Sequence, residues 1–185
     1  MTSPQVSVLL PVYNAQDYLR ESIDSILNQS FTDFELIIAY DPSSDDSRAI
    51  IESYTDPRIQ VIYQEGVGLP ASLNRAKTIA KGKYLARQDA DDVSLPNRFE
   101  EQVKFMELHN LDLCGCDFKI INSIGREIDS IKMPHTQEMM AITLACTVPF
   151  AHGSVMMRKS FLDKAALSYD ESVVSEDYDL WVKFY

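Results

Sequence analysis

The first 92 residues alternate short aliphatic runs with amphipathic stretches, and this alternation constrains the fold more than any other feature of the chain. Buried strands are predicted at residues 6–10, 34–39, 59–63 and 83–88, each bounded by turn-forming residues. Helical spacing of apolar residues follows each of the first three runs. Such alternation is typical of a mostly parallel sheet with right-handed crossovers and helices on both faces. The sequence therefore predicts an α/β fold.

Three residues are predicted to mark the ends of these elements. Pro11 is expected to end the first strand, because proline has no backbone N–H to donate. Asn14 has a side chain suited to capping the first helix. Gly82 suits the position just beyond the third helix, where left-handed backbone is common.

The pattern changes after Asp92 to an α+β arrangement. We expect a helix opened by Pro96, a hairpin formed by Leu111–Ile121 and Glu127–Ile131, a helix capped by Thr136, and a short strand at Ser154–Met157. No linker is visible, so residues 1–185 are expected to form one domain with halves 1–92 and 93–185. The chain stops at Tyr185 within a helical pattern that has no stop signal, which suggests that the second half is incomplete.

Composition and charge narrow the functional classes. The chain has 185 residues, is 45% hydrophobic and carries a net charge of −11, which argues against a nucleic-acid partner. No apolar run reaches the roughly 18 residues of a membrane span, and no secretory signal opens the chain, so a cytoplasmic protein is expected. Three cysteines cannot form a paired framework, and Cys114 and Cys116 are predicted to be buried thiols on one face of a strand.

An acidic motif, Asp89-Ala-Asp91-Asp92, follows the fourth predicted strand. Closely spaced carboxylates raise one another's pKa unless a cation neutralises them, and oxygen-only ligands suit Mg²⁺ or Mn²⁺. The carboxyl edge of an open α/β sheet is also its usual ligand site, and Asp41 ends the second strand at that edge. Taken alone, the motif could equally be a solvated acidic turn.

Four segments, in order, resemble the family-2 inverting glycosyltransferases of GT-A fold. They are Val6–Asn14, the turn around Asp41, Gly82–Asp92 and Glu176–Trp181. The resemblance covers essentially the whole chain. It implies a Rossmann-like sheet, with a nucleotide-binding half at 1–92 and an acceptor-side half at 93–185.

The implied reaction is metal-dependent transfer of a sugar, with inversion, from a nucleotide-diphosphate-sugar to a saccharide or lipid-linked acceptor. A UDP-sugar is the favoured donor, and surface polysaccharide or lipopolysaccharide assembly is the implied pathway. The resemblance also implies Mn²⁺ or Mg²⁺ as cofactor. Peripheral association with the cytoplasmic face of the inner membrane would come through a region beyond residue 185.

The resemblance also distributes roles among individual residues. Asp91 would bind the metal, Asp89 would face the ribose, and Asp177 would be the catalytic base. The predicted nucleotide-sugar contacts are Pro11, Tyr13, Asp41, Asp89 and His152.

Simpler interpretations stay open beside these roles. Asp41 could be a turn or capping residue, Asp177 could stabilise the start of a helix, and His152 could be structural. The family's Asp-Asp-Gly-Ser turn stands here as Tyr40-Asp41-Pro42-Ser43, so its first acid and its glycine are replaced.

Two other functions fit parts of this sequence. A nucleotide-sugar-binding module without transfer activity would explain the altered turn at Tyr40 and Pro42, but Asp89, Asp91 and Asp177 are intact. A haloacid-type phosphatase would carry its acidic pair after the first strand, whereas this motif follows the fourth. The transferase is therefore the preferred hypothesis.

Overall fold

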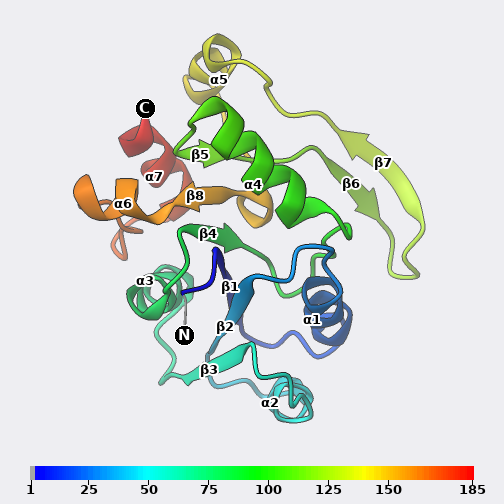
Figure 1. Ribbon diagram of the computed structural model, residues 1–185. Coiled ribbons are helices and arrows are strands. Elements are labelled where there is room, and N and C mark those ends of the chain that lie inside the picture. The colour runs from blue at the N-terminus through cyan, green and yellow to red at the C-terminus, as the bar shows by residue number, and fades with distance from the viewer. Residues whose placement is uncertain (1–2) are drawn as a thin grey trace.

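The computed structural model describes residues 3–185 and contains a six-stranded sheet of order β3-β2-β1-β4-β8-β5 with helices on both faces (Figure 1). The first half holds β1 (Val6–Val12), α1 (Leu19–Leu27), β2 (Phe34–Tyr40), α2 (Ser47–Glu52), β3 (Ile59–Tyr63), α3 (Leu69–Ile79) and β4 (Tyr84–Arg87). Strands β1 to β4 are mutually parallel, which confirms the predicted α/β class.

The second half adds both to this sheet and beside it. It holds α4 (Arg98–His109), β5 (Leu113–Cys114), β6 (Phe118–Ile121), β7 (Glu127–Ile131), α5 (Gln137–Leu144), the 3₁₀ turn η1 (His152–Ser154), β8 (Met156–Arg158), α6 (Lys159–Lys164) and α7 (Glu176–Phe184). Strand β8 is antiparallel to both β4 and β5. The sheet is therefore mostly parallel, with an antiparallel extension at one side.

Strand alternation divides the core between the two faces of the sheet. Val8 and Leu10 of β1 pack with α1, α2 and α4, whereas Leu9 packs with α3, α6 and α7. All three side chains are almost completely buried. Because β1 is covered on both faces, its sequence is apolar at every position except Ser7 rather than alternating.

The predicted element ends at Pro11 and Asn14 were wrong. Pro11 lies inside β1, and it is tolerated there because pairing with β4 ends at Leu9 and leaves a free edge beyond it. Asn14 has a positive φ of 47° and lies ahead of α1, whose N-cap is Tyr18. Its side chain instead accepts a hydrogen bond from the N–H of Ser44.

Gly82 was also assigned the wrong role. Helix α3 ends at Ile79 with Ala80 as its C-cap, and the glycines with positive φ lie elsewhere. Gly82 instead packs against β1, where its N–H donates to Ser7 Oγ at 2.8 Å and an added Cβ would collide with the backbone of Val6 and Ser7. The glycine serves close approach between chain segments rather than a left-handed turn.

The second half follows the prediction in part. The 111–121 run is split, because β5 joins the main sheet and only β6 pairs with β7 as a hairpin. Thr136 caps α5 as expected, accepting from the N–H of Met139. The predicted strand at Ser154 begins two residues later, and Cys116 is half-buried beyond β5 whereas Cys114 is buried.

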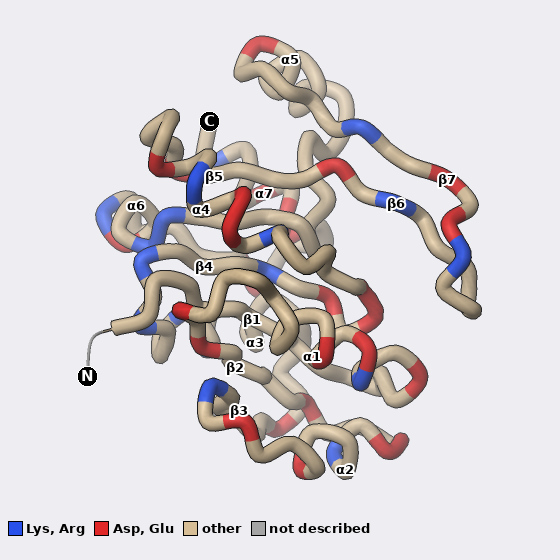
Figure 2. The backbone as a smooth tube through the Cα atoms, turned by 45° about the vertical axis from the view of Figure 1, so that its right-hand side comes forward, with Lys and Arg blue, Asp and Glu red and all other residues tan. Residues whose placement is uncertain are grey.

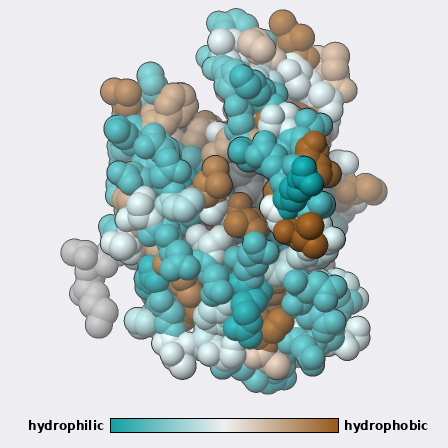
Figure 3. Space-filling view, turned by 90° about the vertical axis from the view of Figure 1, so that its right-hand side faces the viewer, coloured by the Kyte–Doolittle hydropathy of each residue, from teal (hydrophilic) through white to brown (hydrophobic). Residues whose placement is uncertain are grey.

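The β6–β7 hairpin extends away from the sheet (Figure 1). Its apolar side chains Ile124 and Ile128 are 82% and 63% exposed. On the face of the molecule that carries this hairpin, apolar groups are scattered among hydrophilic ones (Figure 3). Within residues 3–185, no helix is long and apolar enough to cross a bilayer.

The close approach of Gly82 to β1 gives a stability prediction. Gly82→Ala should lower the free energy of unfolding by about 1–3 kcal/mol, because the new methyl group must displace β1 backbone. Lys81→Ala, at the exposed neighbouring position, should change it by less than about 0.5 kcal/mol. Urea unfolding of the two variants checks this, and equal stability would contradict the packing argument.

Candidate active site

A cavity of about 620 Å³ lies at the carboxyl edge of the parallel strands, a size typical of small-ligand sites. Its walls come from the segments that follow β1, β2 and β4 and from the start of α3. The predicted residues that line it are Pro11, Tyr13, Asp41, Asp89 and Asp91. His152 and Asp177 are not among its lining residues.

Side-chain hydrogen bonds tie the segments after β1 and β2 together. The N–H of Asn14 donates to Ser43 Oγ at 3.0 Å, and the N–H of Ala15 donates to Ser47 Oγ at 2.9 Å. The N–H of Gln16 donates to Asp45 at 2.9 Å. Small polar side chains thus fix one wall of the cavity.

Asp41 is buried beneath this wall and holds the start of α3. Its carboxylate accepts from the N–H of Gly68 at 2.9 Å and of Val67 at 3.3 Å. A carboxylate in this position satisfies free N–H groups at a helix start and interacts favourably with the helix dipole. Asp41 therefore holds the loop that leads into α3 and does not cap α2, whose N-cap is Asp46, and its contact with a nucleotide base stays a prediction.

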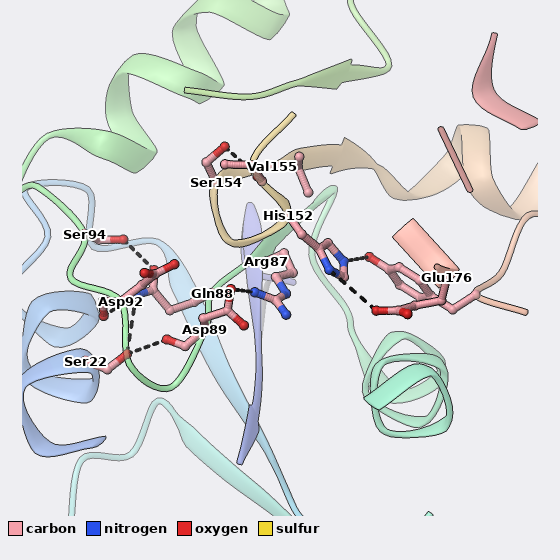
Figure 4. Close-up of polar contacts among 12 residues, drawn as sticks. Ser22, Arg87, Gln88, Asp89, Asp92, Ser94, His152, Ser154, Val155 and Glu176 are labelled. Carbon is pink, nitrogen blue, oxygen red and sulfur yellow. Dashed lines mark hydrogen bonds and ion pairs between the residues drawn. The ribbon is translucent and has the colours of Figure 1, made fainter. Parts of the chain in front are cut away.

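The acidic loop after β4 is held in place through its backbone. Ser22 Oγ donates to the carbonyl of Asp89 at 2.9 Å, and Gln88 Nε2 donates to the carbonyl of Asp92 at 2.7 Å (Figure 4). Gln88 also accepts from Ser94 Oγ at 2.7 Å. The three carboxylates of the loop are consequently presented by a backbone that other parts of the fold anchor.

These three carboxylates have different surroundings. Asp89 forms an ion pair with Arg87, whose side chain is only 2% exposed. Asp91 is exposed on the cavity wall and makes no side-chain hydrogen bond or ion pair within residues 3–185. Partial burial of the carboxyl group, together with the charges of Asp89 and Asp91, raises the pKa of Asp92 to about 6.

The side chains at this cavity suit a metal ion that takes few of its ligands from the protein. Within the described part of the chain, no three His, Cys, Asp or Glu side chains converge as a metal cluster. Asp91 offers a free carboxylate, and Mg²⁺ commonly takes one or two protein carboxylates and completes its shell with substrate phosphates and water. The residues present therefore fit a metal ion that binds together with a phosphate-bearing ligand.

A second polar group lies on the other side of Arg87. His152 Nε2 lies 3.0 Å from the hydroxyl oxygen of Tyr169, and Nδ1 lies 3.9 Å from Glu176 Oε1. The ring also packs edge-on against Trp181. Burial, with a smaller contribution from the Arg87 charge, lowers the pKa of His152 to about 2, so the ring is neutral at physiological pH.

Asp177 lies in the first turn of α7, beside Glu176. Its Oδ1 accepts from the N–H of Tyr178 at 2.7 Å, which matches the predicted acidic start of a helix. It is half-buried, and its charge, like that of Glu176, reaches Tyr169. Asp177 therefore belongs to the polar group around His152 rather than to the cavity wall.

The sequence alone did not reveal the parts played by Arg87, Tyr169 and Glu176. Arg87 carried a usable signal, because a charged residue inside an otherwise apolar strand just before an acidic motif suggests an internal partner. Glu176 stands in one of the four segments that resemble the family, but nothing in the sequence pairs it or Tyr169 with His152, since only the fold brings these residues together.

The comparisons with known proteins agree with this geometry. The model for glycosyl transferase family 2 matches residues 7–165. The chain belongs to this family. The O-antigen biosynthesis glycosyltransferase WbnJ of Escherichia coli is 37% identical over 181 residues, which cover 96% of this chain and 70% of WbnJ.

Two solved structures show the shared fold. S. aureus TarS 1–349 in complex with UDP has a TM-score of 0.76 at 22% identity, over 94% of this chain and 53% of TarS 1–349. The mannosyltransferase PcManGT from Pyrobaculum calidifontis, in complex with GDP-Man and Mn²⁺, has a TM-score of 0.73 at 17% identity, over 99% of this chain and 52% of PcManGT. The GT-A fold is thereby confirmed.

The family-2 chain is shorter than the proteins that it matches. It spans between 59% and 70% of the lengths of five curated relatives, and about half of each solved structure.

The burial of His152 predicts how stability depends on pH. A histidine in the unfolded chain has a pKa near 6.5. Below that pH the unfolded state therefore binds a proton that the buried ring of the folded state does not bind. Relative to His152→Gln, stability should therefore fall as pH drops from about 6.5 to 4.5, with a slope that approaches about 1.4 kcal/mol per pH unit at the lower end of this range.

Urea unfolding across this pH range measures the difference between the two proteins. His135→Gln, at an exposed histidine, should keep the pH dependence of the unmodified protein. Parallel stability curves for His152→Gln and the unmodified protein would contradict the prediction.

Proposed function

We propose that this protein transfers a sugar, with inversion and with the help of a divalent metal, from a nucleotide-diphosphate-sugar to a saccharide or lipid-linked acceptor. The observation that carries the proposal is the cavity that gathers Asp41, Asp89 and the free carboxylate of Asp91 at one sheet edge. The sequence similarity of this chain to WbnJ favours a role in surface polysaccharide assembly. Residues 1–92 would bind the donor and 93–185 would serve the acceptor side.

The donor is proposed to be a UDP-sugar. Because β1 lies between β2 and β4 in the sheet, Asp41 and the acidic loop flank Pro11 and Tyr13 along the cavity, so the base would lie toward Asp41 and the diphosphate toward the acidic loop. TarS is described in complex with UDP, which supports UDP, whereas PcManGT is described with GDP-Man. Asp89 would face the ribose.

Asp91 would hold the metal, as Mn²⁺ or Mg²⁺. When bound, the metal would supply Lewis-acid stabilisation of negative charge on the departing nucleoside diphosphate. Within residues 3–185, Asp91 makes no side-chain hydrogen bond or ion pair, so its carboxylate keeps its lone pairs for this role. PcManGT, described with Mn²⁺, supports the choice of ion.

Asp177 would act as the base that accepts the proton of the acceptor hydroxyl. A free aspartate has a pKa near 3.9, so it can accept this proton only as the hydroxyl acidifies during attack, and only within about 3 Å. Neutral His152 would lie beside this route as a hydrogen-bonding group, either to the acceptor or to a donor phosphate.

The competing proposal is a nucleotide-sugar-binding module that does not transfer. It rests on Tyr40 and Pro42 in the turn after β2. Both proposals include donor binding, and only transfer separates them. Peripheral membrane association on the cytoplasmic side remains part of the first proposal and would require chain beyond residue 185.

The metal assignment predicts the behaviour of Asp91→Asn. UDP should bind more tightly with Mn²⁺ than without it, and Asp91→Asn should remove most of this gain, because an amide is a poor ligand for a hard cation. Calorimetric titration of UDP with and without Mn²⁺ measures both effects. Asp129→Asn, on the exposed hairpin, is the control. Metal-independent binding, or an unchanged Asp91→Asn, would refute the assignment.

The base assignment predicts a separate outcome for Asp177→Asn. Donor binding should persist, while transfer in the full-length protein should fall by about 10²- to 10⁴-fold, because general base catalysis is lost. Release of UDP from a UDP-sugar measures turnover. Asp179→Asn, on the same helix and paired with Lys183, should keep its activity. Persistent transfer in Asp177→Asn would place the base elsewhere.

A further inference from the structure

We propose that Arg87 is a positioning residue for the donor, acting through Asp89. This inference rests on the proposed function, because it assigns Asp89 to the donor cavity. Arg87 lies at the end of β4, between the acidic loop and the turn η1, and its guanidinium forms an ion pair with Asp89 (Figure 4). The pair would hold the Asp89 carboxylate at one orientation on the cavity wall.

The backbone of Arg87 is fixed from two directions. Its N–H donates to the carbonyl of Val155 at 2.9 Å, and its carbonyl accepts from Arg98 Nη2 at 2.7 Å. Its side chain is 2% exposed, so it cannot relocate into solvent. The fixed backbone and the burial confine the guanidinium beside Asp89, and among residues 3–185 its Nε and Nη1 have no hydrogen-bond partner, which leaves the ion pair as its main polar contact.

The backbone of turn η1 packs directly against the ion pair of Arg87 and Asp89. A Cβ added to Gly153 would stand 2.8 Å from Asp89 Oδ2 and 3.3 Å from Arg87 Nη1, and it would also collide with Asp92. No side chain other than hydrogen fits there without moving the pair. The glycine allows the backbone of η1 to pack directly on the two charged groups.

The charge of Arg87 also offsets crowding among the acids. Asp89, Asp91 and Asp92 lie within four residues, and like charges repel unless a cation intervenes. Acidic residues outnumber basic ones in this chain by 28 to 17, and blue Lys and Arg segments gather around α6 rather than in the acidic loop (Figure 2). Arg87 is the cation that contacts Asp89.

A merely structural role for Arg87 predicts something different. If Arg87 only supported the fold, its substitution would weaken donor binding whether or not Asp89 kept its carboxylate. If Arg87 acts through Asp89, removing the carboxylate first makes the Arg87 substitution silent for donor affinity. A double-mutant cycle separates the two roles.

The experiment measures UDP affinity with Mn²⁺ by calorimetry for Arg87→Lys, Asp89→Asn and the double variant. Lysine keeps the positive charge but lacks the planar guanidinium, whose N–H donors have a fixed geometry. Each single variant should bind UDP about 10- to 100-fold more weakly, as seen when outer-shell partners of a site are removed. The double variant should bind no more weakly than the weaker single variant. Additive losses would overturn the proposal.

Arg158→Lys is the matched control. Arg158 is also an arginine at a strand end and pairs with Asp112 at 2.9 Å, yet it lies away from the cavity. It should keep its UDP affinity. A loss as large as that of Arg87→Lys would show a general effect of weakening the sheet and would overturn the specific role.

Two further outcomes are distinguishable. If the unmodified protein binds neither UDP nor GDP, the proposed function itself fails. If it binds UDP and the cycle is additive, only the Arg87 inference fails.

Should Arg87→Lys not fold, NMR of the arginine Nε–H signals in Asp89→Asn replaces the cycle. Slow rotation of the Arg87 guanidinium in the unmodified protein should become fast in Asp89→Asn, and an unchanged rate would overturn the proposal.

Discussion

The hydrogen bonds of the Arg98 guanidinium are the constraint on which the candidate site depends. From the first turn of α4, Arg98 donates to the carbonyl of Arg87 at 2.7 Å, to Gln88 Oε1 at 2.8 Å and to Gln102 Oε1 at 3.0 Å. Burial lowers the pKa of Arg98, but arginine starts so far above neutrality that the group remains charged. A buried charge must have its donors satisfied, so the strand end and the acidic loop are restricted to the arrangement that satisfies them.

The direction of β8 explains why the two polar groups meet at all. Because β8 is antiparallel to β4, Met156 at its start lies beside Ala86 near the end of β4. Turn η1, which precedes β8, is thereby delivered to the carboxyl edge where Arg87 and Asp89 lie. A parallel strand at this position would have carried the same turn to the opposite edge of the sheet. The single reversal in strand direction thus brings turn η1 of the second half to the cavity at the carboxyl edge.

The local sequence pattern predicted the strands and helices of the first half well. It predicted poorly which residues far apart in the sequence lie together. The parallel strands and the common edge for Asp41 and Asp89 follow from strand–helix alternation alone, since parallel strands end together. Gly82 was misassigned because close approach to β1 and a left-handed helix end call for the same residue type. The neighbours of His152 could not be predicted, because Tyr169 and Glu176 reach it only through packing of segments far apart in sequence. The metal-binding and base roles remain predictions.

The altered turn after β2 bears on which of the two proposed functions is preferable. A decayed site would be expected to leave its substituted residues without structural partners. Tyr40 is instead buried, its ring packs against Tyr63 at a centroid distance of 5.8 Å, and its hydroxyl oxygen accepts from the N–H of Ser43 at 3.1 Å. Ser43 in turn accepts from Asn14, so Tyr40 helps to fix the cavity wall. Tyrosine thus supports the wall in the place of the family's first acid, which favours an adapted donor site over a degraded one.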